Sequence, residues 1–332
     1  MARGFHRPEN ARSEAERPPR PPKERDLLSI SDIARELPSL LEAAEKLKRL
    51  RAEQVFPRSL QDRNVAMVFE NPSTSLRSSF EVAVQDMGGH AVYLSHTEIQ
   101  SGREGRIADS ARVLSRYYDA IVYRAHHWQD GVELARWANV PVINALDDRE
   151  RPCQVVADLL TLKERWRGRF RDRRLAYLGD GNSLLNSLVL GCAIVGLDLV
   201  AAIPEGYRPT DSLLAEAAGF ARGTGASTHI VADPKEAARD ADAIYIDGWA
   251  PREEEAEEAR CKVAFRGYTL DEAMLNLAHP GAFAMHDLPA QRGREIADAV
   301  MDGPRQALWD QAENRLHAQK AILELLMRPR GD

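Results

Sequence analysis

The stretch Phe69–Glu81, "FENPSTSLRSSFE", joins the β-rich run "NVAMVFE" (64–70) to an apolar helical run. We expect a buried strand at 64–70, a loop, and a helix from about Ser78. The loop carries the hydroxyls of Ser73, Thr74 and Ser75 and the cation of Arg77. Hydroxyls, free N–H groups and a cation at a helix start suit an anion, most simply phosphate. They equally suit an ordinary N-cap with solvated serines, so this loop alone leaves both interpretations open.

The same alternation of short apolar runs and helical segments continues along the chain. Further strands are expected at 90–95, 120–125, 140–146, 175–180, 198–205, 227–233, 243–249 and within 282–290. An N-terminal helix is expected within 28–52, with Ser31 as a plausible cap, and an amphipathic helix at 307–327. Two rounds of βαβ alternation predict an α/β protein with two doubly wound parallel-sheet domains.

Composition narrows the class of protein. The 332 residues are 44% hydrophobic and 29% charged, with a net charge of −6, which is ordinary for a soluble protein and indicates no nucleic-acid or membrane partner. The cysteines Cys153, Cys192 and Cys261 form no CxxC pair, so we expect reduced thiols, no metal site and a cytoplasmic location. No apolar run is long enough for a membrane span, and residues 1–25 read as a disordered polar tail.

Polar residues gather where the predicted strands end, which is where open α/β sheets bind ligands. Arg124 ends one strand, and "RPCQ" places Arg151 and Gln154 before a helix. "GDGNSLLNSL" (179–188) is a weak match to a dinucleotide loop, because it lacks the third glycine, and its Asn182 suits a small polar ligand instead. Asp247 ends "IDGW". One half therefore offers cations and hydroxyls, and the other offers carboxylates and amides, which suits an anion facing an amine.

A second group of polar residues follows the last predicted strand. "HDLPAQRG" (286–293) supplies His286, Asp287, Leu288 and Arg292. A lone arginine at a strand end, such as Arg124, is also compatible with a surface salt bridge, and Pro152 is common at a first helical position for structural reasons alone.

In their order, these loops resemble those of the aspartate and ornithine carbamoyltransferases, and particularly the ornithine branch. "STSLR" resembles the family's phosphate loop STRTR, and "VYRA" its Y-R-G strand end. "RPCQ", "GDGNSLLNSL", "IDGW" and "HDLPAQRG" resemble HPCQ, GDGNN…NSL, TDxW and HCLPAxRG. With the helix "AENRLHAQKAIL", the resemblance spans about residues 26–328.

The resemblance implies a carbamoyl-phosphate-binding domain (26–150, completed by the helix 305–330) and an amine-binding or amino-acid-binding domain (151–304). It also implies a homotrimer whose subunits share active sites, with no metal or other cofactor. The carbamoyl-phosphate ligands it implies, together with the loop residues argued above, are Ser73, Thr74, Ser75, Arg77, Gln100, Arg124, Gln154 and Arg292, with Gln100 contributed by a neighbouring subunit. The expected amine-binding residues are Asn182, Ser183, Asp247, Arg252, Asp287 and Leu288, and the expected catalytic residues are Arg124, Thr74, Arg151 and Asp287.

The chain departs from the family's pattern at several of these positions. Ser75 and Leu76 stand where the family has arginine and threonine, and Arg151 replaces a histidine. Ser183 replaces an asparagine, and Asp287 replaces a cysteine. Gly105-Arg106 replaces the family's Glu-Ser in the loop that a neighbouring subunit contributes. Ala250-Pro251-Arg252 replaces the Ser-Met-Gly closing loop of the ornithine enzymes.

Two interpretations compete for these departures. In the favoured one, the chain moves the carbamoyl group of carbamoyl phosphate to the amino group of a small amine or diamino acid, ornithine-like but other than ornithine itself. Arg151 then supplies a forked donor, and Asp287 adds a second acceptor near the nucleophile or acts as a base. In the alternative, the chain is a catalytically impaired paralogue that binds ligands or assembles, or a related transferase with a different donor.

Overall fold

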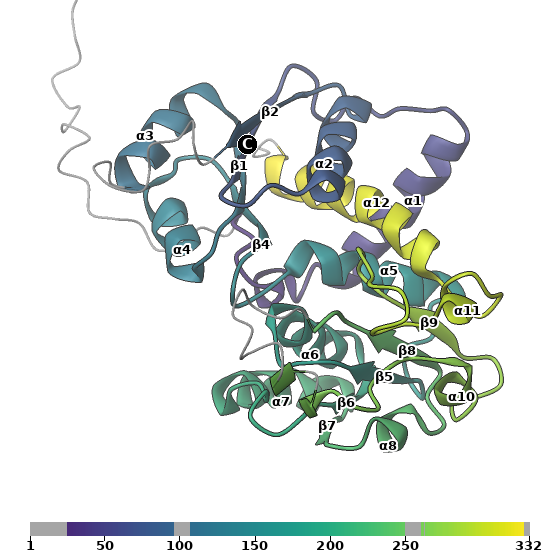
Figure 1. The fold of residues 1–332 in the computed structure, drawn as a ribbon. Helices are drawn as coiled ribbons and strands as arrows, with labels where there is room; N and C mark the ends of the chain where they lie inside the picture. Colours follow the sequence, from purple (N-terminus) through teal and green to yellow (C-terminus); the bar gives the residue numbers. More distant parts are fainter. Residues whose placement is uncertain (1–24, 96–106, 250–259, 262, 329–332) are drawn as a thin grey trace, which may run out of the picture.

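The computed structural model describes residues 25–95, 107–249, 260–261 and 263–328. Predictions that concern Gln100, Arg106, Arg252 and almost all of the tail 1–25 therefore lie outside the described residues. The remaining chain forms two parallel sheets, one above the other in Figure 1, with the C-terminal helix alongside the first.

The first sheet has the strand order β2-β1-β3-β4, and all its neighbours are parallel. Its strands are β1 (Asn64–Phe69), β2 (His90–Ser95), β3 (Ala120–Arg124) and β4 (Val142–Leu146). The central strands β1 and β3 are almost fully buried, as expected for apolar runs covered on both faces. Each of the four predicted strands in this half is confirmed to within two residues at either end.

The second sheet has the order β7-β6-β5-β8-β9 and is also parallel throughout. Its strands are β5 (Arg174–Leu178), β6 (Asp198–Ala202), β7 (Thr228–Val231), β8 (Ala243–Ile246) and β9 (Phe283–Met285). In both sheets the strand order reverses beside the first strand, which creates a crevice at the carboxyl ends. The predicted α/β class with two doubly wound domains is confirmed.

Helices cover the faces of both sheets. In the first half they are η2 (Ile30–Ile33), α1 (Leu37–Ala52), α2 (Thr74–Asp86), α3 (Ile107–Tyr117), α4 (Trp128–Trp137) and α5 (Pro152–Arg165). In the second half they are α6 (Ser183–Val195), α7 (Asp211–Thr224), α8 (Pro234–Ala238), α10 (Glu272–Leu275), α11 (Asp298–Met301) and α12 (Leu308–Met327). The long helix α12 packs against α1, α2 and α5, so the chain returns to its first half as predicted (Figure 1).

Two helix starts differ from the expectation. Ser29, not Ser31, is the N-cap: its side chain accepts from the Ser31 N–H and begins η2, whereas α1 starts only at Leu37. Helix α2 begins at Thr74 rather than near Ser78, with Ser73 as N-cap. The polar residues of the STSLR stretch are therefore the first turn of the helix itself. Serine and threonine at a helix start favour caps as readily as loops, which is why the sequence pattern placed the boundary too late.

The three cysteines, Cys153, Cys192 and Cys261, are free and buried. Among the described residues, no group of three or more His, Cys, Asp or Glu side chains is arranged to hold a metal ion. No helix in the described part of the chain has the length and apolar character needed to cross a bilayer.

Candidate active site

A cleft of about 330 Å³ lies between the carboxyl ends of the two sheets. Residues from β3, β4, α5, the loops after β8 and β9, the start of α2 and α12 line it. The polar and charged lining residues are Ser73, Ser75, Arg124, Arg151, Gln154, Asp247, Asp287, Gln291, Glu295 and Arg315. The cleft therefore brings together most of the strand-end residues that the sequence singled out.

One end of the cleft is built for an anion. The Ser73 hydroxyl accepts from the Leu76 N–H at 3.4 Å. The N–H groups that precede Leu76 in the first turn of α2 have no acceptor within the helix, because they lie at its start. Arg124 reaches the cleft where the pairing of β3 with β4 shifts, since Tyr123 pairs with Asn144 but Arg124 with Leu146. Such an irregularity re-aims a side chain at a strand end.

Arg124 is kept charged but unpaired. Its buried Nε has no hydrogen-bond partner among the described residues. Burial and then the nearby charge of Arg151 lower its pKa, although an arginine remains protonated at any ordinary pH. A half-buried guanidinium with an unpaired donor beside a helix N-terminus is a strong site for phosphate or a carboxylate.

Arg315 is a residue of the site that the sequence analysis missed. It projects from α12, where its Nη1 donates to the Ser75 hydroxyl at 3.2 Å and its Nη2 donates to the Asp287 carbonyl at 2.6 Å. It is 7% exposed. The available signal was a charged residue on the buried face of an amphipathic helix, since arginine is rarely buried without a partner.

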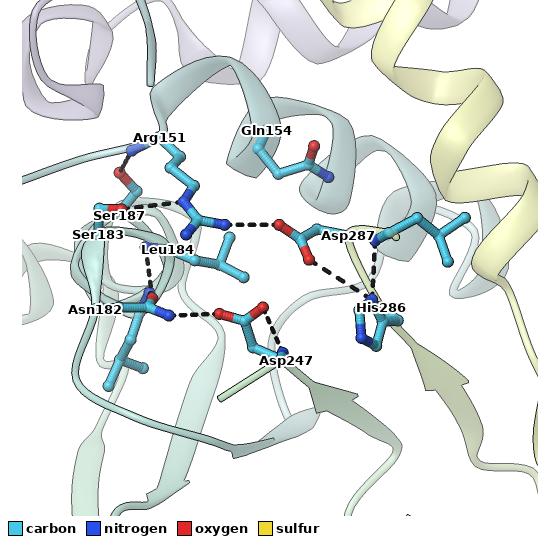
Figure 2. Close-up of polar contacts among 12 residues, drawn as sticks. Arg151, Gln154, Asn182, Ser183, Leu184, Ser187, Asp247, His286 and Asp287 are labelled. Atoms are coloured by element: carbon cyan, nitrogen blue, oxygen red, sulfur yellow. Dashed lines mark hydrogen bonds and ion pairs between the residues drawn. The ribbon is translucent and has the colours of Figure 1, made fainter. Parts of the chain in front are cut away.

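Arg151 lines the cleft, and Figure 2 shows its contacts with Ser183, Ser187 and Asp287. Its Nη1 donates to Asp287 Oδ2 at 2.8 Å, and its Nε donates to the Ser183 hydroxyl at 3.0 Å. Its backbone N–H donates to the Ser187 hydroxyl at 2.9 Å. Burial lowers the pKa of Arg151, but the carboxylates of Asp247 and Asp287 outweigh it and raise the pKa above its usual value.

The other end of the cleft presents a carboxylate. Asp247, at the end of β8, accepts from Asn182 Nδ2 at 2.6 Å and from the Gly248 N–H at 2.8 Å (Figure 2). Burial, followed by the charge of Asp287, raises the pKa of Asp247 to about 7. Asn182 is itself fixed, because its Oδ1 caps α6 by accepting from the Leu184 N–H at 2.9 Å. Asp247 is thus positioned to bind a cation such as an ammonium group.

The glycine-rich loop before α6 serves packing. Gly181 donates its N–H to the Tyr207 carbonyl at 2.7 Å, and a Cβ at position 181 would lie only 2.1 Å from that oxygen. The glycine is therefore needed for the close approach of two backbones. This explains the partial match to a dinucleotide loop without a nucleotide.

The loop after β9 holds its shape through His286. The His286 Nδ1 accepts from the Leu288 N–H at 2.8 Å, and its Nε2 lies 3.5 Å from Glu295 Oε1. Leu288 has φ +51°, a left-handed conformation that costs a non-glycine residue on the order of 1 kcal/mol and clusters at functional sites. The loop thereby presents Asp287 and Leu288 to the cleft.

Some predicted ligands do not line the cleft in this structure. Arg77 pairs with Glu81 at 2.8 Å, and its guanidinium covers the Tyr93 ring. Arg292 pairs with Asp298 and Asp302 at the surface, and Thr74 is exposed at the start of α2. Gln154 does line the cleft, but its Nε2 donates to the buried Asp158 at 2.8 Å. A motif match fixes a backbone position and leaves the direction of a long side chain open.

Comparisons with known proteins agree with this geometry. Residues 25–164 match the model of the aspartate/ornithine carbamoyltransferase carbamoyl-P binding domain, and residues 171–326 match that of the Asp/Orn binding domain. The chain is 48% identical over 303 residues to an ornithine carbamoyltransferase of Archaeoglobus fulgidus, which covers 91% of this chain and 97% of the relative. It is 47% identical over 304 residues to one of Methanoculleus marisnigri, with the same two coverages.

Solved structures give the same result. The ornithine carbamoyltransferase from Pyrococcus furiosus superposes with a TM-score of 0.88 at 43% identity, covering 92% of this chain and 97% of that one. The enzyme from Gloeobacter violaceus gives a TM-score of 0.82 at 44% identity, covering 92% and 99%. This chain belongs to the aspartate/ornithine carbamoyltransferase family, on its ornithine carbamoyltransferase branch.

Proposed function

We propose that the protein transfers the carbamoyl group of carbamoyl phosphate to the side-chain amine of a diamino acid, giving a ureido product and phosphate. The observation that carries this proposal is the division of one cleft. Arg124, Arg315 and the N-terminus of α2 gather at one end, and Asp247 with Asn182 stands at the other. Such a cleft binds an anionic donor and a cationic acceptor next to each other.

The residues suit carbamoyl transfer step by step. The donor's phosphate binds the free N–H groups of α2 beside Ser73 and Arg124, and its carbonyl oxygen meets Arg315 and the free Nη2 of Arg151. The acceptor's neutral nitrogen attacks the carbonyl carbon, and the bond from that carbon to the phosphate oxygen breaks. Phosphate leaves with the electron pair and takes up the proton that the nitrogen loses. Two effects accelerate the transfer. Donors that are already in place stabilise the charge that develops in the transition state, and the cleft aligns the two substrates.

The acceptor must carry one ammonium group for Asp247 and one nitrogen that can lose its charge before attack. Ornithine and its homologues meet this description, and the relatives at 43–48% identity are named ornithine carbamoyltransferases. The expectation of an acceptor other than ornithine rested on the departures at Ser183, Arg252 and Asp287, with Asp287 as an additional site for a substrate cation. Asp287 already binds Arg151, so that reason no longer favours another acceptor, and ornithine is our leading candidate.

The quaternary structure and the cellular location remain part of the proposal. The family resemblance supports a homotrimer in which Gln100 of one subunit completes the site of the next. Three free thiols, all buried, support a reduced and cytoplasmic setting.

Phosphate release tests the proposal. The purified protein is incubated with carbamoyl phosphate and a panel of ornithine, lysine, 2,4-diaminobutyrate, putrescine and aspartate, and the ureido product is identified by mass. Carbamoyl phosphate labelled with ¹³C at the carbonyl shows which group moves. We expect labelled product with at least one diamino acid. If carbamoyl phosphate binds and no panel member yields product, the alternative of a ligand-binding paralogue is favoured.

A further inference from the structure

Four positions at which the chain departs from its family's pattern lie in one continuous set of hydrogen bonds. Ser75 accepts from Arg315, and Arg315 donates to the carbonyl of Asp287. The side chain of Asp287 binds Arg151, and Arg151 donates to Ser183. These residues come from α2, the loop before α5, α6, the loop after β9 and α12. If the chain had lost activity through independent substitutions, we would not expect the substituted residues to contact one another.

The central pair of this set is largely shielded from solvent. The side chains of Arg151 and Asp287 are 22% and 14% exposed. Removing one partner of a buried ion pair leaves an uncompensated charge, which is why such pairs act as a unit. The role of Asp287 therefore has to be interpreted together with that of Arg151.

The geometry fixes where the third nitrogen of Arg151 points. A guanidinium is planar, so holding Nη1 on Asp287 and Nε on Ser183 determines the plane and direction of the whole group. Its Nη2 makes no hydrogen bond to any described side chain and belongs to a residue that lines the cleft. In Figure 2 the guanidinium lies between Ser183 and Asp287, above Asp247.

We propose that Asp287 is a positioning residue for Arg151. It holds the guanidinium so that Nη2 meets the carbonyl oxygen of the carbamoyl group, replacing the cationic contact that Ser75 cannot supply. This inference rests on the proposed carbamoyl transfer. It assigns Asp287 an indirect role instead of that of a base, because one carboxylate oxygen is bound to Arg151 and the other lies 3.6 Å from His286 Nδ1.

Chemical rescue tests the role directly. The R151A variant removes the guanidinium and leaves a space beside Asp287 and Ser183 that fits methylguanidinium. We expect R151A to lose about 10²–10³-fold in kcat, the typical effect of removing one donor to the developing oxyanion. Millimolar methylguanidinium should raise the kcat of R151A at least tenfold. It should leave the kcat of R151A/D287N unchanged, because the added cation needs the Asp287 carboxylate.

The controls separate this effect from a general salt effect. Methylammonium carries the same charge without the fork, so it should not rescue R151A, and methylguanidinium should not change the wild-type rate. Equal rescue in R151A and R151A/D287N would overturn the proposal, and so would the absence of any rescue in R151A. Thermal unfolding and carbamoyl phosphate binding establish that each variant is folded.

A double-mutant cycle gives a second, independent measurement. D287N should lower kcat about 10–100-fold on its own, whereas R151Q/D287N should be no slower than R151Q, because Asp287 acts only through Arg151. If the loss of kcat in the double variant were instead the product of the losses in the two single variants, Asp287 would act on the substrate itself, and the inference would be refuted. If the wild-type protein transfers no carbamoyl group at all, the proposed function fails, and a D287N crystal structure with Arg151 unmoved would then overturn the positioning role separately.

Discussion

Arg315 donates from its Nη1 to the Ser75 hydroxyl at 3.2 Å, a contact between residues 240 positions apart in the chain. It links α12, the last helix, to the first turn of α2, where the phosphate is proposed to bind. The same guanidinium reaches the Asp287 carbonyl at 2.6 Å. One side chain therefore connects the anion end of the cleft to the loop after β9.

Replacing Arg315 should impair donor binding. We expect R315A to raise the KM for carbamoyl phosphate about tenfold and to lower kcat/KM by about 10²–10³, because it removes a charge-assisted donor from the cleft. Steady-state kinetics with the donor varied measures both. R328A, which removes the arginine just beyond the end of α12, is the matched control and should stay within twofold of wild type. Unchanged donor kinetics in R315A would show that Arg315 is only structural.

Arg124 should be indispensable, and Arg77 should not. Arg124 is half-buried with an unpaired Nε at the cleft, so R124A should reduce kcat/KM at least about 10³-fold. Arg77 is exposed and paired with Glu81, so R77A should cost less than about tenfold. The two arginines were both predicted as phosphate ligands, and the same assay ranks them. A larger loss in R77A than in R124A would mean that the phosphate lies on the outer side of α2.

The sequence was sufficient for the fold, and it singled out many of the polar residues that line the cleft. Central strands of a parallel sheet are buried on both faces, so they appear as short apolar runs, and β1, predicted at 64–70, is observed at 64–69. Ligands meet the carboxyl ends of such strands, which is why Arg124, Asp247 and Asp287 could be chosen from position alone.

The contacts inside the cleft were not predictable from local pattern. Arg315 contributes through the packing of α12, and Arg292 turns away to Asp298 and Asp302. The pairing of Arg151 with Asp287 joins residues 136 positions apart. Spacing along the chain carries no information on which of several rotamers a long side chain adopts, so direction had to come from the three-dimensional structure.

Asp247 should control acceptor affinity. We expect D247N to raise the dissociation constant of a diamino acid about 10–100-fold while leaving that of carbamoyl phosphate within threefold, because Asp247 is the carboxylate proposed to bind the acceptor's ammonium group. Calorimetric titration of each substrate measures both constants. In wild type the acceptor should bind more weakly as the pH falls through about 7, since burial and Asp287 raise the pKa of Asp247 to about 7 and the neutral acid attracts no ammonium.

The control for that pH dependence is D247N itself, which has no carboxylate to protonate at this position. Its weak acceptor binding should not change between pH 6 and pH 8. The same pH dependence in wild type and D247N would assign the titration to another group and remove Asp247 from the acceptor site.

A shared active site should allow two inactive variants to complement each other. In the proposed trimer, Q100A damages the residue given to a neighbour, whereas R124A damages the subunit's own cleft. Co-expressed in equal amounts, they should recover about a quarter of the wild-type activity, because that fraction of sites pairs an intact Arg124 with an intact Gln100. Activity that stays at the level of the separate variants would contradict a shared site, and sedimentation measures whether the protein is a trimer.

The stability of the protein should depend on Asp158, a fully buried residue beneath the cleft. Its Oδ1 accepts from Gln154 Nε2 at 2.8 Å and from Gln311 Nε2 at 2.7 Å, and its Oδ2 accepts from the Tyr245 hydroxyl at 3.2 Å. Burial raises the pKa of Asp158 from 3.8 to about 7. Between about pH 4 and 7 the folded chain therefore holds a proton that the unfolded chain lacks, so this group's contribution to stability falls as the pH rises across that window.

The D158N variant imitates the protonated form, since its amide oxygen can accept from both glutamines and its NH₂ can donate to the Tyr245 hydroxyl. We expect the free energy of unfolding of D158N, relative to wild type, to rise by on the order of 2–4 kcal/mol between pH 4.5 and pH 8 and to be constant above pH 8. Denaturant unfolding at several pH values measures the difference. D310N, at an exposed carboxylate near the start of α12, is the control and should show no comparable trend. A D158N difference that is the same at every pH would show that Asp158 does not exchange a proton on unfolding in this range.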